Sequence, residues 1–110
     1  MSAKLRAIIK RPDEEYGHVT NISATLRNLQ ITVGGYIETL TLKTNWAEPE
    51  KGKTFVLIID EEGLNNGKEL NCSVQGFQLR GTIVVLGVDE DEFADCPLTF
   101  DEWKKMLRGE

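Results

Sequence analysis

The sequence predicts a single-domain α+β fold, with about five mainly antiparallel strands and two helices packed on them in the order β-β-α-β-β-β-α. Three observations lead to this prediction. The stretch Ile22–Leu42 changes from helical to strand periodicity at a pair of glycines. Two apolar runs, over residues 54–60 and 80–88, are too short for typical helices and rich in β-branched residues. Near the C-terminus, a Thr-x-x-Glu pattern is typical of the start of a helix. A length of 110 residues predicts one domain over residues 1–110.

The first segment predicts a β-hairpin. Lys4–Lys10 contains four apolar residues and stops before Arg11-Pro12, which indicates a short strand. Residues 12–17 are Pro-Asp-Glu-Glu-Tyr-Gly, a turn sequence, because proline fixes φ and glycine permits positive φ. The segment 17–22 alternates with β-branched residues and predicts the returning strand.

A capped helix and a strand come next. Ser23 is the predicted N-cap, since its hydroxyl can accept a hydrogen bond from an early helical N–H. Gly34 is the predicted end of the helix, in left-handed conformation. After Tyr36 the periodicity becomes that of a strand. The residues predicted to form the apolar stripe of the helix are Leu26, Leu29 and Val33.

The middle of the chain combines a loop and a buried strand. Residues 44–53 form a polar loop, from which Trp46 is expected to cover the edge of the core. The continuous apolar run Thr54–Asp60 predicts a central strand that is buried on both faces. Asn65-Asn66-Gly67 then predicts a turn.

Two further strands and a helix complete the prediction. Leu70–Val74 is a candidate short edge strand, and Arg80–Val88 is a second core strand in which Gly81 and Gly87 mark a bulge or a close backbone approach. The acidic segment 89–95 turns the chain. The last helix is predicted to begin at Thr99, which forms a capping box with Glu102. A hydrophobic staple between Leu98 and Trp103 supports this start. The apolar face of the helix is expected to contain Phe100, Trp103 and Met106 or Leu107.

Composition narrows the functional classes. The net charge is −5, from 13 basic and 18 acidic residues, and this field would repel phosphate backbones, so nucleic-acid binding is disfavoured. No run of about 18 apolar residues exists, so no membrane span is expected. Charges interrupt the N-terminal apolar segment, which argues against a signal peptide and favours the cytoplasm. Cys72 and Cys96 are predicted to be buried, reduced thiols.

Catalytic and metal patterns are weak. His18 is the single histidine, so a hydrogen-bonded strand residue is a better interpretation than a zinc ligand. The acidic segment 89–95 lacks the glycine and the glutamate of a calcium loop. Residues 60–62 could supply carboxylates for acid–base work, without a visible partner. Gly34-Gly35 follows a helix instead of preceding one, which excludes a phosphate loop. We therefore expect no cofactor, no metal and no enzymatic activity.

The sequence contains more side chains suited to ligand binding than to catalysis. A nucleotide-sized ligand needs a guanidinium for phosphate, an aromatic ring for the base and amides for the base edge. The alternative is that the arginines form ordinary surface ion pairs. The candidate ligand-binding residues are Arg27, Asn28, Tyr36, Asn71 and Arg80.

Several segments together resemble a family of small proteins from phages, prophages and mobile elements of Gram-positive bacteria, whose domain has no known function. The most specific piece is Leu-Gln-x-x-Val-Gly-Gly-Tyr-Ile-Glu, at residues 29–38. One departure is Gly67-Lys-Glu-Leu, where members often have Gly-Leu-Pro. The matching segments are Ala7–Pro12, Leu26–Glu38, Val56–Gly63, Asn71 and Gly81–Gly87, followed by the acidic turn into the last helix.

The resemblance implies a phage accessory protein that acts by binding in the host bacterial cytoplasm. Similar small proteins trap cyclic oligonucleotides or cyclic ADP-ribose isomers and so counter bacterial immunity of the Thoeris and CBASS types. We therefore expect a homo-oligomeric binder of such a signal, with sites between subunits. One alternative is an acidic inhibitor that presents its turns and a sheet edge to a host defence or restriction enzyme. Another is an enzyme that cleaves the signal.

Overall fold

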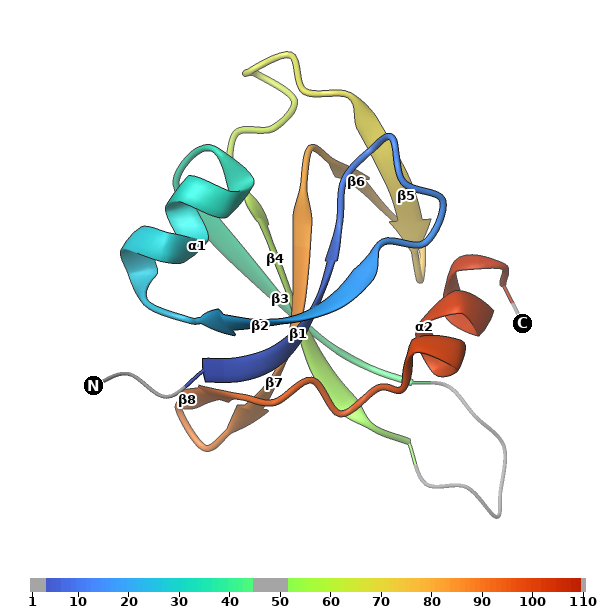
Figure 1. Ribbon diagram of the computed structural model, residues 1–110. Helices are drawn as coiled ribbons and strands as arrows, with labels where there is room; N and C mark the ends of the chain where they lie inside the picture. The colour runs from blue at the N-terminus through green and yellow to red at the C-terminus, as the bar shows by residue number, and fades with distance from the viewer. Residues whose placement is uncertain (1–3, 45–51, 110) are drawn as a thin grey trace.

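The computed structural model describes residues 4–44 and 52–109. These residues form two helices and several strands in one α+β arrangement (Figure 1), so the predicted fold class is confirmed. The predicted position of Trp46 lies outside the described residues. The elements are β1 (Lys4–Lys10), β2 (His18–Ser23), α1 (Leu26–Val33), β3 (Ile37–Lys43), β4 (Thr54–Asp60), β5 (Leu70–Val74), β6 (Phe77–Arg80), β7 (Ile83–Asp89), β8 (Glu92–Ala94) and α2 (Phe100–Leu107).

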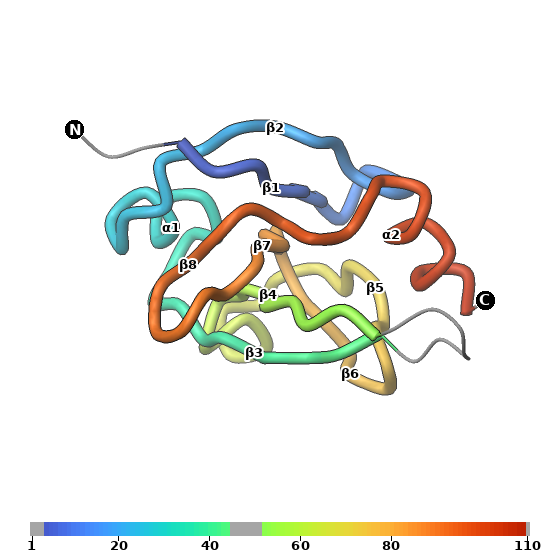
Figure 2. Tube along the Cα trace, turned by 90° about the horizontal axis from the view of Figure 1, so that it is seen from below, coloured from blue at the N-terminus to red at the C-terminus, as the bar shows by residue number. Residues whose placement is uncertain are grey.

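The main sheet is antiparallel throughout, with the order β2-β1-β7-β4-β3. The short strand β8 pairs with the end of β7, and β5 and β6 form a separate two-stranded sheet. The predicted N-terminal hairpin is confirmed, because Lys4 lies opposite Ser23 and Ile9 lies opposite His18. In Figure 2 the main strands are stacked in this order, with α1 on one side and α2 on the other.

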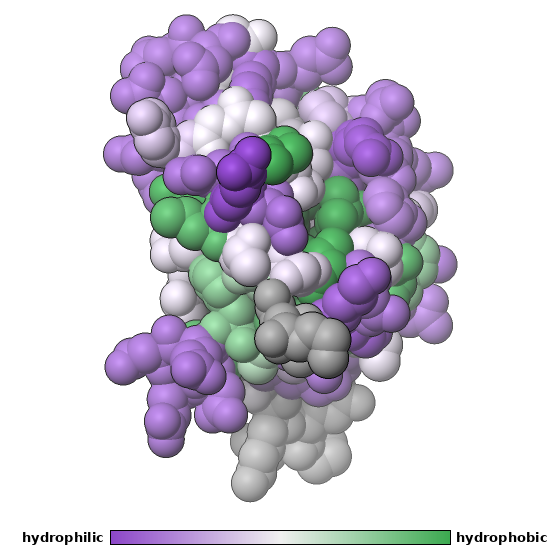
Figure 3. All heavy atoms as spheres, turned by 60° about the vertical axis from the view of Figure 1, so that its left-hand side comes forward, coloured by the Kyte–Doolittle hydropathy of each residue, from purple (hydrophilic) through white to green (hydrophobic). Residues whose placement is uncertain are grey.

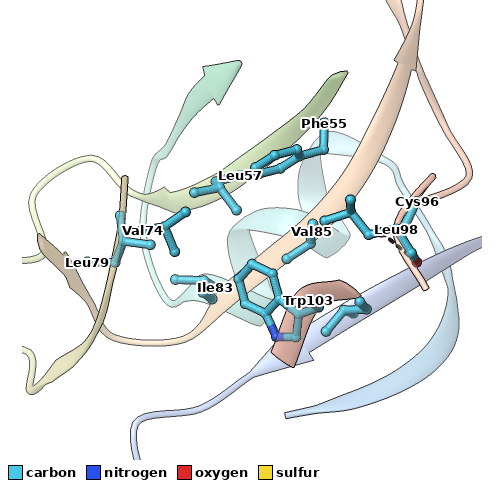
Figure 4. Close-up of a cluster of buried hydrophobic side chains, with 10 residues drawn as sticks. Phe55, Leu57, Val74, Leu79, Ile83, Val85, Cys96, Leu98 and Trp103 are labelled. Atoms are coloured by element: carbon cyan, nitrogen blue, oxygen red, sulfur yellow. Dashed lines mark hydrogen bonds between the residues drawn. The ribbon is translucent and has the colours of Figure 1, made fainter. Parts of the chain in front are cut away.

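Each face of the sheet carries its own core. On β4, Phe55 and Leu57 point to one face and Val56 points to the other, and all three are buried, which confirms that this strand is covered on both sides. The α1 side buries Leu29 against the strands. The α2 side encloses Trp103 (Figure 4), together with side chains of the β5–β6 hairpin.

The first helix begins two residues later than predicted. Thr25, not Ser23, is the N-cap, and its hydroxyl accepts a hydrogen bond from the Asn28 N–H at 3.2 Å. Ser23 is unavailable for this role because it is the last residue of β2, paired with Lys4. Leu26 is consequently the first helical residue and is 60% exposed, so its assignment to the buried stripe was wrong. Gly34 ends the helix with φ of 79°, as predicted.

The last helix has the predicted start. Thr99 and Glu102 form both hydrogen bonds of the capping box, at 3.1 Å and 2.8 Å. Leu98 and Trp103 are fully buried, and the indole Nε1 donates to the carbonyl oxygen of Tyr16 at 2.8 Å. This bond fastens α2 to the β1–β2 turn.

Two chain segments contain more strands than predicted. The run Arg80–Val88 is divided at Gly81, whose φ is 74°, so that β6 ends before it and β7 begins after it. The acidic segment 89–95 contains β8. Gly87 does mark a close backbone approach, because a Cβ there would overlap the carbonyl oxygen of Asp95. The strand count was too low because a turn at one glycine is indistinguishable from a bulge in a β-rich sequence.

Both cysteines are free thiols, Cys96 buried and Cys72 half-buried, and burial raises the pKa of each. Neither of the two helices in the described ranges has the length and apolar character needed to cross a membrane.

Candidate functional site

A hollow of about 440 Å³ lies where α1 ends and β3 begins. Helix α1 contributes Arg27, Gln30 and Ile31 to one wall, and the turn after the helix contributes Gly35 and Tyr36. The space-filling view of the α1 side shows apolar side chains among hydrophilic ones (Figure 3). Two residues that line the hollow are strongly exposed: Tyr36 is 73% exposed and Ile31 is 68% exposed. The hollow therefore offers an aromatic ring and an aliphatic surface to solvent.

The opposite wall is polar and comes from the end of β4 and the loop that follows. It consists of Asp60, Glu62 and Asn66. Asp60 has a side chain that is only 2% exposed, and its carboxylate accepts hydrogen bonds from the Glu62 N–H at 2.9 Å and from Asn66 Nδ2 at 3.1 Å. It also forms an ion pair with Lys68 Nζ at 2.9 Å. Burial alone would raise the pKa of Asp60, but the hydrogen bonds and the Lys68 ammonium outweigh it and lower the pKa.

Lys68 connects this wall to the helix. Its ammonium donates to the carbonyl oxygens of Val33 at 2.5 Å and Gly34 at 3.0 Å, where the helix leaves carbonyls without intrahelical partners. A Cβ on Gly35 would lie 2.7 Å from Asp60 Oδ1, and one on Gly34 would lie 2.6 Å from the ammonium. The double glycine thus ends the helix, as predicted, and also makes room for a buried ion pair. Asp60 is a partner of that pair instead of a free catalytic base.

Arg27 and Tyr36, two of the predicted binding residues, line the same hollow. Within residues 4–44 and 52–109, the Arg27 guanidinium makes no ion pair or hydrogen bond. A guanidinium has five N–H donors, so this side chain can bind an anion bidentately. Arg27 is therefore available for a ligand, and the surface ion pair weighed from the sequence is not formed among these residues.

Arg80 lies in a second, smaller hollow of about 270 Å³, between the end of β4 and β6. One of its nitrogens, Nη1, donates to the carbonyl oxygen of Lys68 at 3.2 Å. This second hollow is also lined by Leu64 and Gln78, and it shares Asp60 with the first. Arg27 and Arg80 therefore lie in neighbouring hollows instead of a single one.

The two predicted asparagines form internal hydrogen bonds. Asn71 donates to the carbonyl oxygens of Lys10 and Gly81, both at 2.8 Å, and accepts from Lys10 Nζ at 2.6 Å. It thereby satisfies a buried lysine, and it lines neither of the two hollows. Asn28 donates to the carbonyl oxygen of Ser23 at 3.0 Å and lines neither hollow.

Three polar residues of the first hollow were not among the predicted ligand-binding residues: Gln30, Glu62 and Asn66. Gln30 could have been found, because it follows Arg27 by three residues and such pairs lie on one helical face. Glu62 and Asn66 could not be placed there, since their loop meets the end of the helix through long-range contacts: Ile37 lies opposite Asp60, and Lys68 pairs with Asp60.

The remaining candidates have ordinary structural roles. His18 Nδ1 lies 2.8 Å from Glu14 Oε2, which agrees with a hydrogen-bonded strand histidine. In the part of the chain that the structure describes, no three histidine, cysteine or acidic side chains gather as a metal site would require.

The fold and the hollow define a small α+β domain with a surface able to hold a compact ligand. The chain belongs to the DUF3846 family, a domain of unknown function, and the match covers residues 5–108. The expectation that the chain belongs to a family whose domain has no known function is thus confirmed. Comparisons with curated proteins and with solved structures gave no significant match.

Proposed function

We propose that this protein binds and sequesters a small nucleotide-like signal, without chemical turnover, in the hollow between Arg27 and Tyr36. The observation that carries the proposal is the Arg27 guanidinium, which has no partner among residues 4–44 and 52–109 and lies in a ligand-sized hollow beside an exposed aromatic ring. The volume of this hollow, about 440 Å³, falls in the range of small-molecule binding sites.

Each part of a nucleotide finds a matching group there. Arg27 can hold a phosphate through paired N–H donors. The base can stack on Tyr36, and such stacking contributes about 1–3 kcal/mol per base. Glu62 can accept hydrogen bonds from ribose hydroxyls, as carboxylates do in dinucleotide-binding folds. The amides of Gln30 and Asn66 suit the donors and acceptors of a base edge.

The charge balance of the hollow is compatible with a phosphate. Asp60 is neutralised by Lys68 at 2.9 Å, so that the carboxylate of Glu62 is the remaining negative group opposite Arg27. One guanidinium and one carboxylate favour a ligand that carries both an anionic group and hydrogen-bond donors. Nucleotides have this composition.

We place this activity in the host bacterial cytoplasm, as part of a phage-type accessory protein that counters immunity by trapping cyclic oligonucleotides or cyclic ADP-ribose isomers. The exposed Ile31 and Tyr36 at the hollow support assembly of two or more copies around the ligand, because covering apolar surface favours association. Sedimentation with and without ligand would show whether the oligomer forms.

The direct test is calorimetric titration of the protein with cyclic dinucleotides, cyclic trinucleotides and cyclic ADP-ribose isomers. We expect one class to bind and to be recovered unchanged by chromatography. Replacing Arg27 by Gln should weaken binding about tenfold or more, since it removes a charged hydrogen bond. The matched control is Arg11→Gln, an arginine on the β1–β2 turn with a 60% exposed side chain. Absence of binding at micromolar protein would refute the proposal, and appearance of products would indicate an enzyme.

A protein–protein inhibitor is the second candidate, supported by the tip of the β7–β8 hairpin. Four consecutive acidic residues there, 89–92, are all exposed and present a concentrated negative surface. A pull-down from host lysate should then capture one stoichiometric partner, and neutralising these four residues should release it. Retention of the partner by the neutralised variant would exclude this surface.

A further inference from the structure

We infer that the ligand contains two nucleotide units, one for each of the two hollows beside the segment Asp60–Leu64. This inference rests on the proposed function and narrows its ligand to a dinucleotide with two phosphates. The first hollow lies on the α1 side of the segment and the second lies on the β6 side.

The two hollows have the same kind of polar groups. The first has the guanidinium of Arg27 and the carboxylate of Glu62. The second has the guanidinium of Arg80 and the carboxylate of Glu61. Glu61 and Glu62 are exposed neighbours in the chain, so consecutive residues serve opposite hollows. This duplication of a cation and an acceptor matches a ligand whose phosphate and ribose occur twice.

The second hollow can also hold a base. Leu64 is 70% exposed and offers an apolar surface, while Gln78 supplies an amide for a base edge. Arg80 Nη1 donates to the Lys68 carbonyl, and in the described part of the chain its other N–H groups have no partner and can bind an anion. The smaller volume, about 270 Å³ against about 440 Å³, makes this the less complete half of the site.

The two hollows are adjacent, because Asp60 lines both, and the proposed ligand spans them. The buried carboxylate of Asp60 is already neutralised by Lys68, so this residue adds no unpaired negative charge to those of Glu61 and Glu62. A mononucleotide would occupy one hollow and leave the other guanidinium unused. A cyclic ADP-ribose isomer has two phosphates but a single adenine, so it would leave one base position empty.

The test is a calorimetric series with mononucleotides, linear dinucleotides, cyclic dinucleotides and cyclic ADP-ribose, in adenine and guanine forms. The proteins are the wild type, Arg27→Gln, Arg80→Gln, the double variant and the control Arg11→Gln. We expect a dinucleotide to bind at least about tenfold more tightly than its mononucleotide, and each single Arg→Gln change to weaken dinucleotide binding about tenfold or more. The double variant should lose both contributions, and the control should match the wild type.

Arg80→Gln also removes a hydrogen bond to the loop, so Arg80→Lys and a thermal melt of each variant separate binding from folding. Equal affinity for mononucleotide and dinucleotide would overturn the inference. So would a folded Arg80→Gln protein with unchanged dinucleotide affinity, and in that case weakened binding by Arg27→Gln would leave the proposed function standing. Absence of binding by every nucleotide would overturn both.

Discussion

The two helices are equally long, eight residues each, yet they cover the two faces of the sheet in different ways. Helix α2 starts with a complete capping box and buries Trp103 entirely. Helix α1 starts with a single Thr25 hydrogen bond and leaves Ile31 exposed beside a hollow. Each face has its own buried core, but the two faces differ at their surfaces. The α2 face is closed around Trp103, whereas the α1 face is open at the hollow, where Ile31 and Tyr36 are exposed. We propose that this open surface serves the ligand.

The largest expected effect concerns the closed face. Trp103→Ala should lower the free energy of unfolding by about 3–5 kcal/mol, because it leaves a large cavity in the core around Phe55 and Ile83. Tyr36→Ala, on the open face, should change it by no more than about 0.5 kcal/mol, since Tyr36 is 73% exposed. Urea denaturation of both variants measures the contrast. Similar losses of unfolding free energy in the two variants would contradict the contrast between the closed and the open face.

The next effect concerns the Lys68–Asp60 ion pair, which connects the end of β4 to the end of α1. Lys68→Met should cost about 3 kcal/mol in the free energy of unfolding, because it leaves the buried Asp60 carboxylate without its partner. Adding Asp60→Asn to this variant should recover part of the loss, since the unpaired charge disappears. A double-mutant cycle in urea measures the coupling. Strictly additive losses would show that the pair is energetically unimportant.

Acid should weaken both faces through different carboxylates. The pKa of Asp60 is lowered in the folded state: burial opposes ionisation, but the Lys68 ammonium and the hydrogen bonds prevail. The stabilisation is therefore complete above the ordinary aspartate pKa of about 3.9 and is lost as pH falls through the lower folded value. On the other face, the pKa of Glu102 is lowered against its burial by the Thr99 N–H and by Lys53.

Urea midpoints between pH 7 and pH 2 test this dependence. Asp60→Asn and Glu102→Gln should each flatten the acid side of the curve relative to the wild type. If the urea midpoint of Asp60→Asn falls with acid as steeply as that of the wild type, the folded state does not lower the pKa of this carboxyl.

The smallest effect compares the two N-caps. Thr99→Ala should cost about 1 kcal/mol, because it removes the hydroxyl of a two-bond capping box. Thr25→Ala should cost less, about 0.5 kcal/mol, since a single bond of 3.2 Å is lost. Thermal melts of the two variants and of Ser23→Ala, which should be neutral to helix capping, give the ranking. A larger loss of stability in Thr25→Ala than in Thr99→Ala would contradict the conclusion that α2 has the stronger N-cap.

Local patterns in the sequence were sufficient for much of the fold. The Thr99 capping box, the Gly34 helix end and the buried strand 54–60 each depend on residues that are close in the chain, and all three are confirmed. The N-cap of α1 was wrong because Ser23 and Thr25 are both capable caps, and pairing of Ser23 with Lys4 decided between them.

The candidate site was less predictable because its parts come from distant segments. Arg27 and Tyr36 could be proposed together, since one helix and its terminal turn carry both. Asn71 could not be recognised as structural, because its partner Lys10 lies 61 residues away. The Lys68 contact with the end of α1 spans 35 residues. Such contacts depend on tertiary packing, so the periodicity of the sequence cannot predict them.

The measurement that tests the central claim most directly is an amide chemical-shift map of the isotope-labelled protein, titrated with the nucleotide that binds in calorimetry. We expect the largest shifts within residues 27–36 and 60–66, which surround the hollow of Arg27 and Tyr36, and no comparable shifts around Trp103. Shifts confined to the β7–β8 hairpin or to the α2 face would contradict the account.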